Sequence, residues 1–165
     1  MKYTKLGNSA LQVSRICMGC MGFGDPESGQ HTWTADEEHS REIIKKGLEL
    51  GVNFFDTAIA YQSGTSEQYL GRAVRDFTKR SDVVIATKFL PRTKEEIEQN
   101  VSGQKHIEKM LDKSLQNLGA DYVDLYICLL YTSFQSAEKV YQVCPPRSTR
   151  RFSCGLKIQG DNILF

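Results

Sequence analysis

The chain has 165 residues, of which 40% are hydrophobic and 25% are charged, with only four prolines. This composition supports one folded domain with its own core and excludes collagen-like, coiled-coil and wholly disordered chains. The 21 basic and 20 acidic residues give a net charge of +1, so the charge offers no basic field for nucleic acid.

The first 130 residues alternate between short apolar runs and segments with helical periodicity. Runs typical of strands occupy residues 13–18, 52–56, 83–88 and 122–128. Three helices are expected between them, because apolar residues recur there at helical spacing. The three apolar faces contain Ile43, Ile44, Gly47 and Leu48; Leu70, Ala73, Val74 and Phe77; and Ile107, Leu111, Leu115 and Leu118.

The ends of these helices carry recognisable signals. Thr34 with Glu37, and Thr65 with Gln68, match the capping-box spacing and are predicted to begin the first and second helices. Gly51 and Gly119 follow the last apolar residues of the first and third helices, where glycine commonly ends a helix.

The alternation of strands and helices predicts an α/β fold with parallel strands. Asp56 and Lys88, which end two strands, lie 32 residues apart (88 − 56), close to the roughly 31 residues of one unit in an eight-unit barrel. A complete barrel needs about 250 residues, so this chain cannot form one by itself. A doubly wound open sheet is the alternative on pattern alone, although its glycine fingerprint is missing after the first strand.

The chain changes character after about residue 130. Residues 131–165 hold two of the four prolines, five basic and two acidic residues, and no clear period. We therefore expect two regions, 1–129 and 130–165, the second irregular and arising from truncation or a reading-frame change. The basic segment 147–151 is expected to be a solvated loop.

The remaining sequence signals concern compartment and metals. No run approaches the ~18–20 apolar residues of a membrane span, and the N-terminus lacks a secretory apolar run. These features predict a cytoplasmic protein with reduced cysteines and no membrane contact. Cys17 and Cys20 form a Cys-x-x-Cys pair without a second ligand pair, so both are interpreted as structural and no metal site is predicted.

Three polar residues lie where a parallel fold places its active site. Asp56 and Lys88 end apolar strands, and the carboxyl ends of parallel strands converge on one face. Tyr61 follows Asp56 on the loop that leaves the same strand end. A phenol beside an ammonium group releases its proton more readily, which suits protonation of a carbonyl oxygen as hydride reaches the carbon. The alternative is structural: a loop cap, a solvated strand end and a packed ring.

Four segments in order resemble the aldo-keto reductases, over about residues 3–128. They read LGNSALQVSRICMGCMGFG, LELGVNFFDTAIAYQSGTSEQYLGRAV, VVIATK and LDKSLQNLGADYVDLYI. The GTSEQYLGRAV part is similar to the branch that includes potassium-channel β subunits and bacterial general-stress reductases. The resemblance implies a TIM barrel that binds NADPH and reduces aldehydes or ketones, here truncated to about four parallel strands with three intervening helices.

The resemblance also implies residue roles. Tyr61 would be the proton donor, Lys88 would activate it, and Asp56 would pair with Lys88. These three, together with Gly19 and Met21 after the first strand, would contact the cofactor. Glycine-rich turns also recur for purely conformational reasons.

The resemblance fails at one catalytic position. The family has a histidine just after the fourth strand, where this chain has Leu129, and leucine cannot donate a hydrogen bond to a carbonyl. His31, His39 and His106 lie elsewhere, the last two in positions expected to be on the surface. Trp33 would line the substrate mouth or anchor a loop by packing.

Three functional classes therefore remain open: an NADPH-dependent carbonyl reductase, a non-catalytic NADPH-binding subunit, and a non-functional fragment. The expected partner is a small carbonyl substrate, with neither nucleic acid nor membrane. Poor cofactor affinity is expected because barrels usually hold phosphates after the seventh and eighth strands. Open sheet edges predict self-association.

Overall fold

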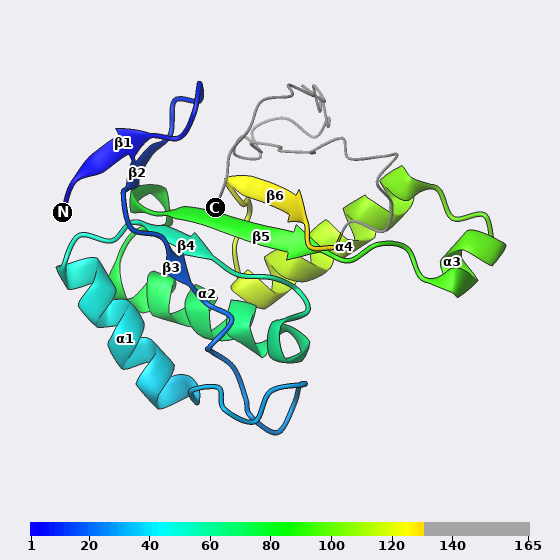
Figure 1. Ribbon diagram of the computed structural model, residues 1–165, viewed down its shortest axis with the longest axis horizontal. Helices are drawn as coiled ribbons and strands as arrows, with labels where there is room; N and C mark the ends of the chain where they lie inside the picture. The colour runs from blue at the N-terminus through cyan, green and yellow to red at the C-terminus, as the bar shows by residue number, and fades with distance from the viewer. Residues whose placement is uncertain (131–165) are drawn as a thin grey trace.

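A computed structural model describes residues 1–130 of the protein (Figure 1). The predictions for the tail, including the segment 147–151, fall outside the described residues. The elements in chain order are β1 (Tyr3–Lys5), β2 (Gln12–Ser14), β3 (Met18–Gly19), α1 (Glu37–Glu49), β4 (Phe54–Asp56), η1 (Tyr61–Gly64), α2 (Thr65–Phe77), η2 (Arg80–Asp82), β5 (Val84–Phe89), α3 (Lys94–Glu98), α4 (Gly103–Leu118) and β6 (Leu125–Cys128).

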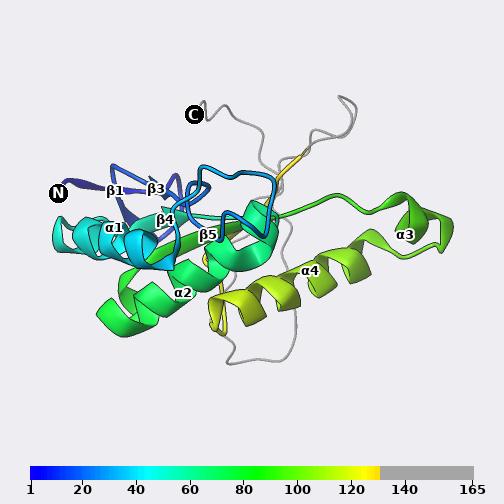
Figure 2. The same ribbon diagram turned by 90° about the horizontal axis from the view of Figure 1, so that it is seen from below.

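The main sheet has four parallel strands whose order, β3-β4-β5-β6, follows the chain. The helices α1, α2 and α4 connect successive strands, and α2 and α4 lie side by side on one side of the sheet (Figure 2). The strand order never reverses, whereas a doubly wound sheet reverses at its switch point. The predicted α/β fold with four parallel strands and three intervening helices is thus confirmed, with the strand order of a barrel.

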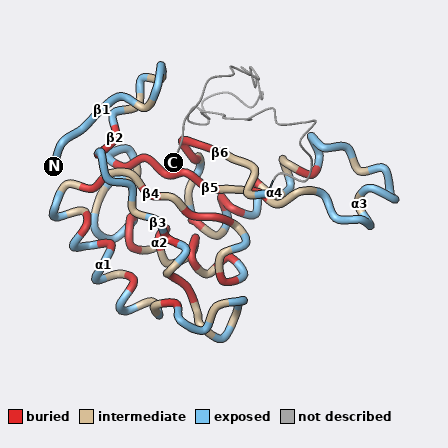
Figure 3. The backbone as a smooth tube through the Cα atoms, viewed as in Figure 1, coloured by how far each residue is buried: buried red, intermediate tan, exposed pale blue. Residues whose placement is uncertain are grey.

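The core has two layers, one on each face of the sheet. Along β5, Ile85 and Phe89 pack in the larger layer with the helices, whereas Val84 and Ala86 pack in the smaller layer on the other face. This alternation follows from the period of two in a strand, and β5 is buried along most of its length (Figure 3). The buried residues of the predicted helix faces lie in the larger layer and include Ile44, Leu70, Val74, Leu111, Leu115 and Leu118. Ile43 and Phe77 were predicted on these faces but are exposed, because both lie on the solvent side of their helices.

The run at residues 13–18 does not form one strand, contrary to prediction. Its first part belongs to β2, which pairs antiparallel with β1 in an N-terminal hairpin, and only Met18–Gly19 joins the main sheet. Val13 of the hairpin packs with Val84, Ala86 and Leu125 on the inner face of the sheet. The hairpin therefore covers apolar surface that the four strands alone would leave open.

The predicted cap at Thr34 is also wrong. The first helix begins at Glu37, and Asp36 is its N-cap, accepting a hydrogen bond from the backbone N–H of His39 at 3.0 Å. Residues 34–35 are instead part of the preceding loop, because Ala35 bridges Phe23 and the Thr34 hydroxyl donates to the carbonyl of His31 at 3.3 Å.

The second predicted capping box is likewise absent. Thr65 is the first residue of α2, and its N-cap is Gly64, whose φ of +91° is left-handed. The Thr65 hydroxyl donates to the carbonyl of Gln62 at 2.7 Å and accepts from the backbone N–H of Asp25 at 2.9 Å. Loop contacts thus occupy the hydroxyl that was expected to cap the helix.

The predicted helix ends are confirmed at both glycines. Gly51 follows the C-cap of α1 with φ +86°, and Gly119 caps α4 with φ +59°. The short helix α3 was not predicted, although Thr93 and Glu96 form a capping box there. Within residues 1–130, no helix is long and apolar enough to cross a membrane.

Candidate active site

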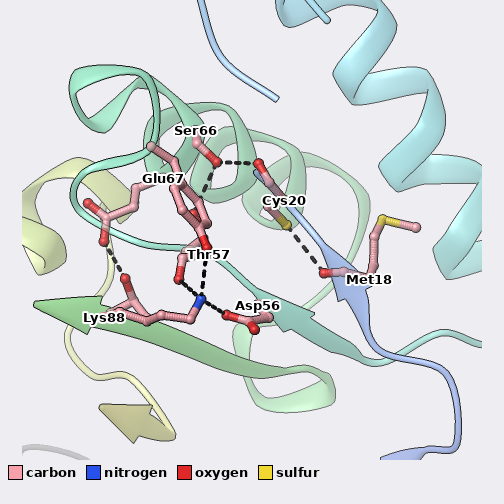
Figure 4. A network of polar contacts seen from close by, with 9 residues as sticks. Met18, Cys20, Asp56, Thr57, Ser66, Glu67 and Lys88 are labelled. Carbon is pink, nitrogen blue, oxygen red and sulfur yellow. Dashed lines mark hydrogen bonds and ion pairs between the residues drawn. The ribbon is translucent and has the colours of Figure 1, made fainter. Parts of the chain in front are cut away.

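The ammonium group of Lys88 has three partners at the carboxyl ends of β4 and β5 (Figure 4). Its Nζ donates to the carbonyl of Thr57 at 2.8 Å and to the hydroxyl of Tyr61 at 3.3 Å. It also forms an ion pair with the carboxylate of Asp56. Three acceptors match the three N–H donors of an ammonium group.

Strand register brings these residues together. Asp56 is the last residue of β4 and pairs with Ala86 of β5, two residues before Lys88. Tyr61 begins η1 on the loop that leaves β4, and the N–H of Ile59 in this loop donates to the carbonyl of Lys88 at 3.2 Å. The structure thus places the three residues singled out from the sequence at one rim of the sheet.

The electrostatics of this cluster depend on its partial burial. The side chain of Lys88 is 14% exposed and that of Asp56 is 36% exposed. Charges in such a setting are screened by salt less than surface charges are. The ammonium also lies 5.0 Å from the centroid of the Tyr61 ring. Because Lys88 donates to the phenol oxygen, the hydrogen of the Tyr61 hydroxyl is left for another acceptor.

The turn directly after Tyr61 has a strained backbone. Gln62 and Ser63 have φ values of +46° and +54°, a region that costs energy for residues other than glycine. The Gln62 side chain is buried, and its Nε2 donates to the carbonyls of Asp25 and His31, both at 2.8 Å. Its Oε1 accepts from the N–H of His31 at 3.0 Å. These bonds hold the turn and tie it to the loop before α1.

Of the two positions expected near a cofactor, Gly19 lies directly beside Asp56, and Met21 follows two residues later in the chain. Gly19 pairs with Asp56 in the sheet, and a side chain added at Gly19 would meet no atom within 4 Å. Met21 is 41% exposed. Trp33 is 62% exposed and lies beside the ring of His31, with centroids 5.1 Å apart.

The Cys-x-x-Cys pair forms no disulfide. Cys20 is fully buried, and its thiol donates to the carbonyl of Met18 at 3.5 Å. Burial raises the pKa of the Cys20 thiol, and the nearby Asp56 carboxylate raises it further, so the thiol stays protonated. Cys17 is exposed. Among residues 1–130, no group of three or more His, Cys, Asp or Glu residues is arranged to hold a metal ion.

The histidines do not supply the expected fourth catalytic group. Leu129 lies just past β6, where its N–H donates to the carbonyl of Phe89 at 2.8 Å. His39 is on the surface of α1, as expected, but His106 is buried, contrary to prediction. Two neighbours explain the burial: a Glu96 carboxylate oxygen of α3 lies 2.7 Å from His106 Nδ1, and the carbonyl oxygen of Leu90 lies 2.7 Å from Nε2.

Sequence reasoning missed the buried polar residues behind the site. Ser66 and Glu67 are both fully buried in the first turn of α2. One signal could have found Glu67: it stands at helical spacing with Leu70, Gly71 and Val74, so a carboxyl group falls within the apolar stripe of the helix. The buried glutamine at position 62 had no comparable signal.

Comparison with known proteins identifies relatives of this chain. Residues 15–129 match the Aldo/keto reductase family. The aldo-keto reductase YhdN of Bacillus subtilis (strain 168) is 33% identical over 126 residues, covering 76% of this chain and 37% of that protein. A probable voltage-gated potassium channel subunit beta of Oryza sativa subsp. japonica is 35% identical over 130 residues, covering 78% of this chain and 37% of that protein.

Solved structures agree with these matches. The holo form of aldo-keto reductase AKR11C1 from Bacillus halodurans superposes with a TM-score of 0.60 at 34% identity, covering 76% of this chain and 39% of its own. An aldo-keto reductase from Klebsiella pneumoniae in complex with NADPH shares the fold, with a TM-score of 0.56 at 23% identity over 74% of this chain and 37% of its own.

The chain therefore spans about two fifths of the length of these proteins. Its four-stranded sheet corresponds to part of their TIM barrel. The profile match, the relatives and the superposition together show that the chain belongs to the aldo/keto reductase family.

Proposed function

We propose that Asp56, Tyr61 and Lys88 are the catalytic residues of an NADPH-dependent reduction of aldehydes or ketones to alcohols. The observation that carries the proposal is the Lys88 ammonium, which contacts the Asp56 carboxylate, the Thr57 carbonyl and the Tyr61 hydroxyl at once. Membership of a family of oxidoreductases supports the reaction class.

In this proposal Tyr61 is the proton donor. A bound NADPH would supply the hydride that reaches the carbonyl carbon of the substrate. The hydroxyl of Tyr61 donates to the carbonyl oxygen and transfers its proton there as negative charge develops, which yields the alcohol. The phenolate that remains lies beside the Lys88 ammonium, 3.3 Å away, and regains its proton from solvent. Asp56 and the Thr57 carbonyl hold the ammonium in place.

We propose that the nicotinamide end of the cofactor lies against Gly19 and Met21; the free space at Gly19 beside Asp56 and the exposure of Met21 support this. The phosphate end of a barrel-bound ligand usually lies on loops after the seventh and eighth strands, and the described residues contain four parallel strands. We therefore propose that residues 1–129 are the reductase-like region, residues 130–165 a separate tail, and that this chain alone binds NADPH weakly. Leu129 at the fourth catalytic position further lowers the turnover that we expect.

The second candidate is a non-catalytic subunit that binds the same cofactor. Two observations favour it: the 35% identity to the probable channel subunit of rice, and a leucine where the carbonyl would need a donor. A non-functional fragment is the third candidate, favoured by the share of the barrel that the chain spans.

Two measurements separate the candidates. Titration with NADPH, followed by cofactor fluorescence, should show weak but saturable binding. If no binding is seen at millimolar NADPH, the chain is a non-functional fragment and the other two candidates are excluded. Turnover of an aromatic aldehyde is then compared with that of Tyr61→Phe. We expect at most slow reduction, lost by at least about 100-fold in the variant. Binding without any turnover supports the non-catalytic subunit, and a rate that survives in Tyr61→Phe rules out Tyr61 as the proton donor.

A further inference from the structure

The first turn of α2 joins the strand ends behind the site (Figure 4). The hydroxyl of Ser66 donates to the carbonyl of Cys20 at 2.7 Å and lies 3.1 Å from the hydroxyl of Thr57. Ser66 is fully buried, so these contacts are shielded from water. They connect α2 to the segments that leave β3 and β4.

The next residue, Glu67, makes the corresponding contacts with β5 and α4. The Thr87 hydroxyl donates to Oε1 of Glu67 at 2.6 Å, and the side-chain amide of Asn117 donates to Oε2 at 2.8 Å. Burial raises the pKa of the Glu67 carboxyl group, and the hydrogen bonds from Thr87 and Asn117 oppose this rise. Both oxygens of the carboxyl group are thus occupied by donors from different elements.

A fully buried carboxyl group such as that of Glu67 is not expected to add to the free energy of unfolding. Its neighbours on the buried face of α2 include Leu70 and Val74, which pack in the apolar core. Burying a polar or charged group costs free energy even when it is bonded, and replacing such groups by apolar ones of similar size is often neutral or stabilising. The role of Glu67 therefore lies in the residues that its hydrogen bonds fix in place.

Ser66 and Glu67 contact residues that are adjacent in sequence to Asp56 and Lys88. Thr57 follows Asp56, and its carbonyl accepts the hydrogen bond from Lys88. Thr87 precedes Lys88 in β5, so the two side chains point to opposite faces of the strand. Fixing Thr57 and Thr87 from the helix side thus limits the movement of the two strand ends that set the position of the ammonium.

We propose that Ser66 and Glu67 are positioning residues that hold the Lys88 ammonium at hydrogen-bonding distance from the Tyr61 hydroxyl. The inference rests on the proposed function of the Lys88–Tyr61 pair. It assigns a role to the first turn of α2, which touches neither substrate nor cofactor in the proposed reaction.

The test is the NMR signal of the Lys88 ammonium in the full chain without added cofactor, assigned by its loss in Lys88→Met. We compare Glu67→Met, which removes both acceptors, with Glu67→Gln, which keeps an acceptor for Thr87 and can bond to a flipped Asn117. Exchange of the ammonium hydrogens with water should be about tenfold faster in Glu67→Met, as expected for one weakened hydrogen bond, and close to wild type in Glu67→Gln.

Val74→Ala is the matched control. Val74 lies on the same helix, two turns after Glu67, and its truncation removes core packing but none of the hydrogen bonds of Glu67. If Val74→Ala accelerates exchange as much as Glu67→Met does, Glu67 acts only on stability and the proposal is wrong. Should Glu67→Met not fold, Thr87→Val removes the hydroxyl donor at nearly constant shape and is expected to show the same acceleration.

The readout also separates this inference from the proposed function. Equal exchange in wild type, Glu67→Met and Thr87→Val would overturn the positioning role, whatever the chain does with NADPH. If exchange of the Lys88 ammonium is faster in Glu67→Met than in wild type but the wild-type chain binds no NADPH, the proposed function is overturned and the positioning of the ammonium still holds.

Discussion

The buried side chain of Gln62 holds the turn that follows Tyr61 at the candidate active site. Gln62 is buried between a strained turn and the loop before α1, with three hydrogen bonds to backbone groups. Its side chain supplies hydrogen bonds to backbone groups of that loop, which in a helix or strand would come from other backbone groups. Tyr61, one residue earlier, owes its placement to the same turn.

Replacing Gln62 with alanine should therefore destabilise the protein. The change leaves the carbonyls of Asp25 and His31 without their donor, and we expect a loss of about 1–3 kcal/mol in the free energy of unfolding. Urea denaturation measures it. Gln30→Ala, in the same loop but exposed, is the control and should change stability by less than about 0.5 kcal/mol. Equal effects of the two changes would contradict the role given to Gln62.

Glu96 gives the protein a predictable response to acid. The backbone N–H of Thr93 lowers the pKa of its carboxyl group, with further help from Lys109 and His106. A folded-state pKa below the unfolded value means that the stabilisation is complete above about pH 4.5 and is lost as the pH falls through the folded-state value. Glu96→Gln should thus be less stable than wild type at pH 6, with a difference that shrinks toward pH 3.

Urea midpoints at several pH values measure this difference. Glu98→Gln, at the exposed end of the same helix, is the control and should follow wild type across the range. A gap between wild type and Glu96→Gln that stays constant from pH 6 to pH 3 would show that the carboxylate charge is not responsible.

Part of the site could be predicted from single residues and part could not. Asp56 and Lys88 were found because a charged residue at the end of an apolar strand is conspicuous, and Tyr61 because it follows on the same loop. Gln62 and Ser66 could not be found, because the backbone groups that their side chains contact in His31 and Cys20 lie 31 and 46 residues away and depend on how the chain folds. The burial of His106 was missed because it depends on contacts with Leu90 and Glu96, 16 and 10 residues earlier in the chain, which the spacing within α4 does not reveal.

At the scale of elements, α2 and α4 pack closely against each other at Gly71. A side chain at Gly71 would place its Cβ 2.0 Å from the carbonyl oxygen of Leu118, which is backbone and cannot yield easily. Gly71 thus permits α2 and α4 to pack, and the network of Glu67 and Asn117 forms in the same interface.

Gly71→Ala should consequently lower the free energy of unfolding by about 1–3 kcal/mol through overpacking. Gly103→Ala is the matched control, because a methyl group at the start of α4 would meet nothing within 4 Å. We expect the control to lie within about 0.5 kcal/mol of wild type. Thermal or urea denaturation of both variants checks the pair, and a neutral Gly71→Ala would mean that the helices can separate without cost.

Elements were predicted well where the spacing of apolar residues determines them, and poorly where a polar side chain can bond either to a helix end or to a loop. Most residues of the helix faces and the closing glycines followed from spacing, because burial of an apolar stripe dominates helix formation in a folded protein. Ile43 and Phe77 are the exceptions, since both are exposed. The two threonine caps failed because Thr34 and Thr65 bond to loop backbone instead. The hairpin of β1 and β2 was missed because its short strands have too few residues for alternation to show.

At the scale of the whole molecule, the inner face of the sheet shapes behaviour in solution. Val84, Ala86 and Leu125 are covered by the hairpin, but Phe54 and Ile127 are only half-buried. Apolar surface beside an edge strand favours association.

We expect the protein to associate with itself at rising concentration, through the face that contains Ile127. Sedimentation velocity over a concentration series measures this. Ile127→Lys should weaken association, whereas Ile43→Lys, on the exposed side of α1, should leave it unchanged. Equal association in the two variants would place the contact elsewhere on the molecule.

The origin of residues 130–165 is a question for the encoding DNA. A change of reading frame predicts that another frame past codon 128 continues with a reductase-like sequence. If neither of the other frames contains one, that origin is excluded.

The order of the sheet has a consequence for how the protein is made. Each strand pairs with the one synthesised just before it, and the helices between them pack within the same 130 residues. As the chain leaves the ribosome, each new strand of the main sheet therefore finds its partner strand already synthesised, so the sheet can assemble in the order of synthesis. Assembly can begin at the first strands without waiting for any later part of the chain.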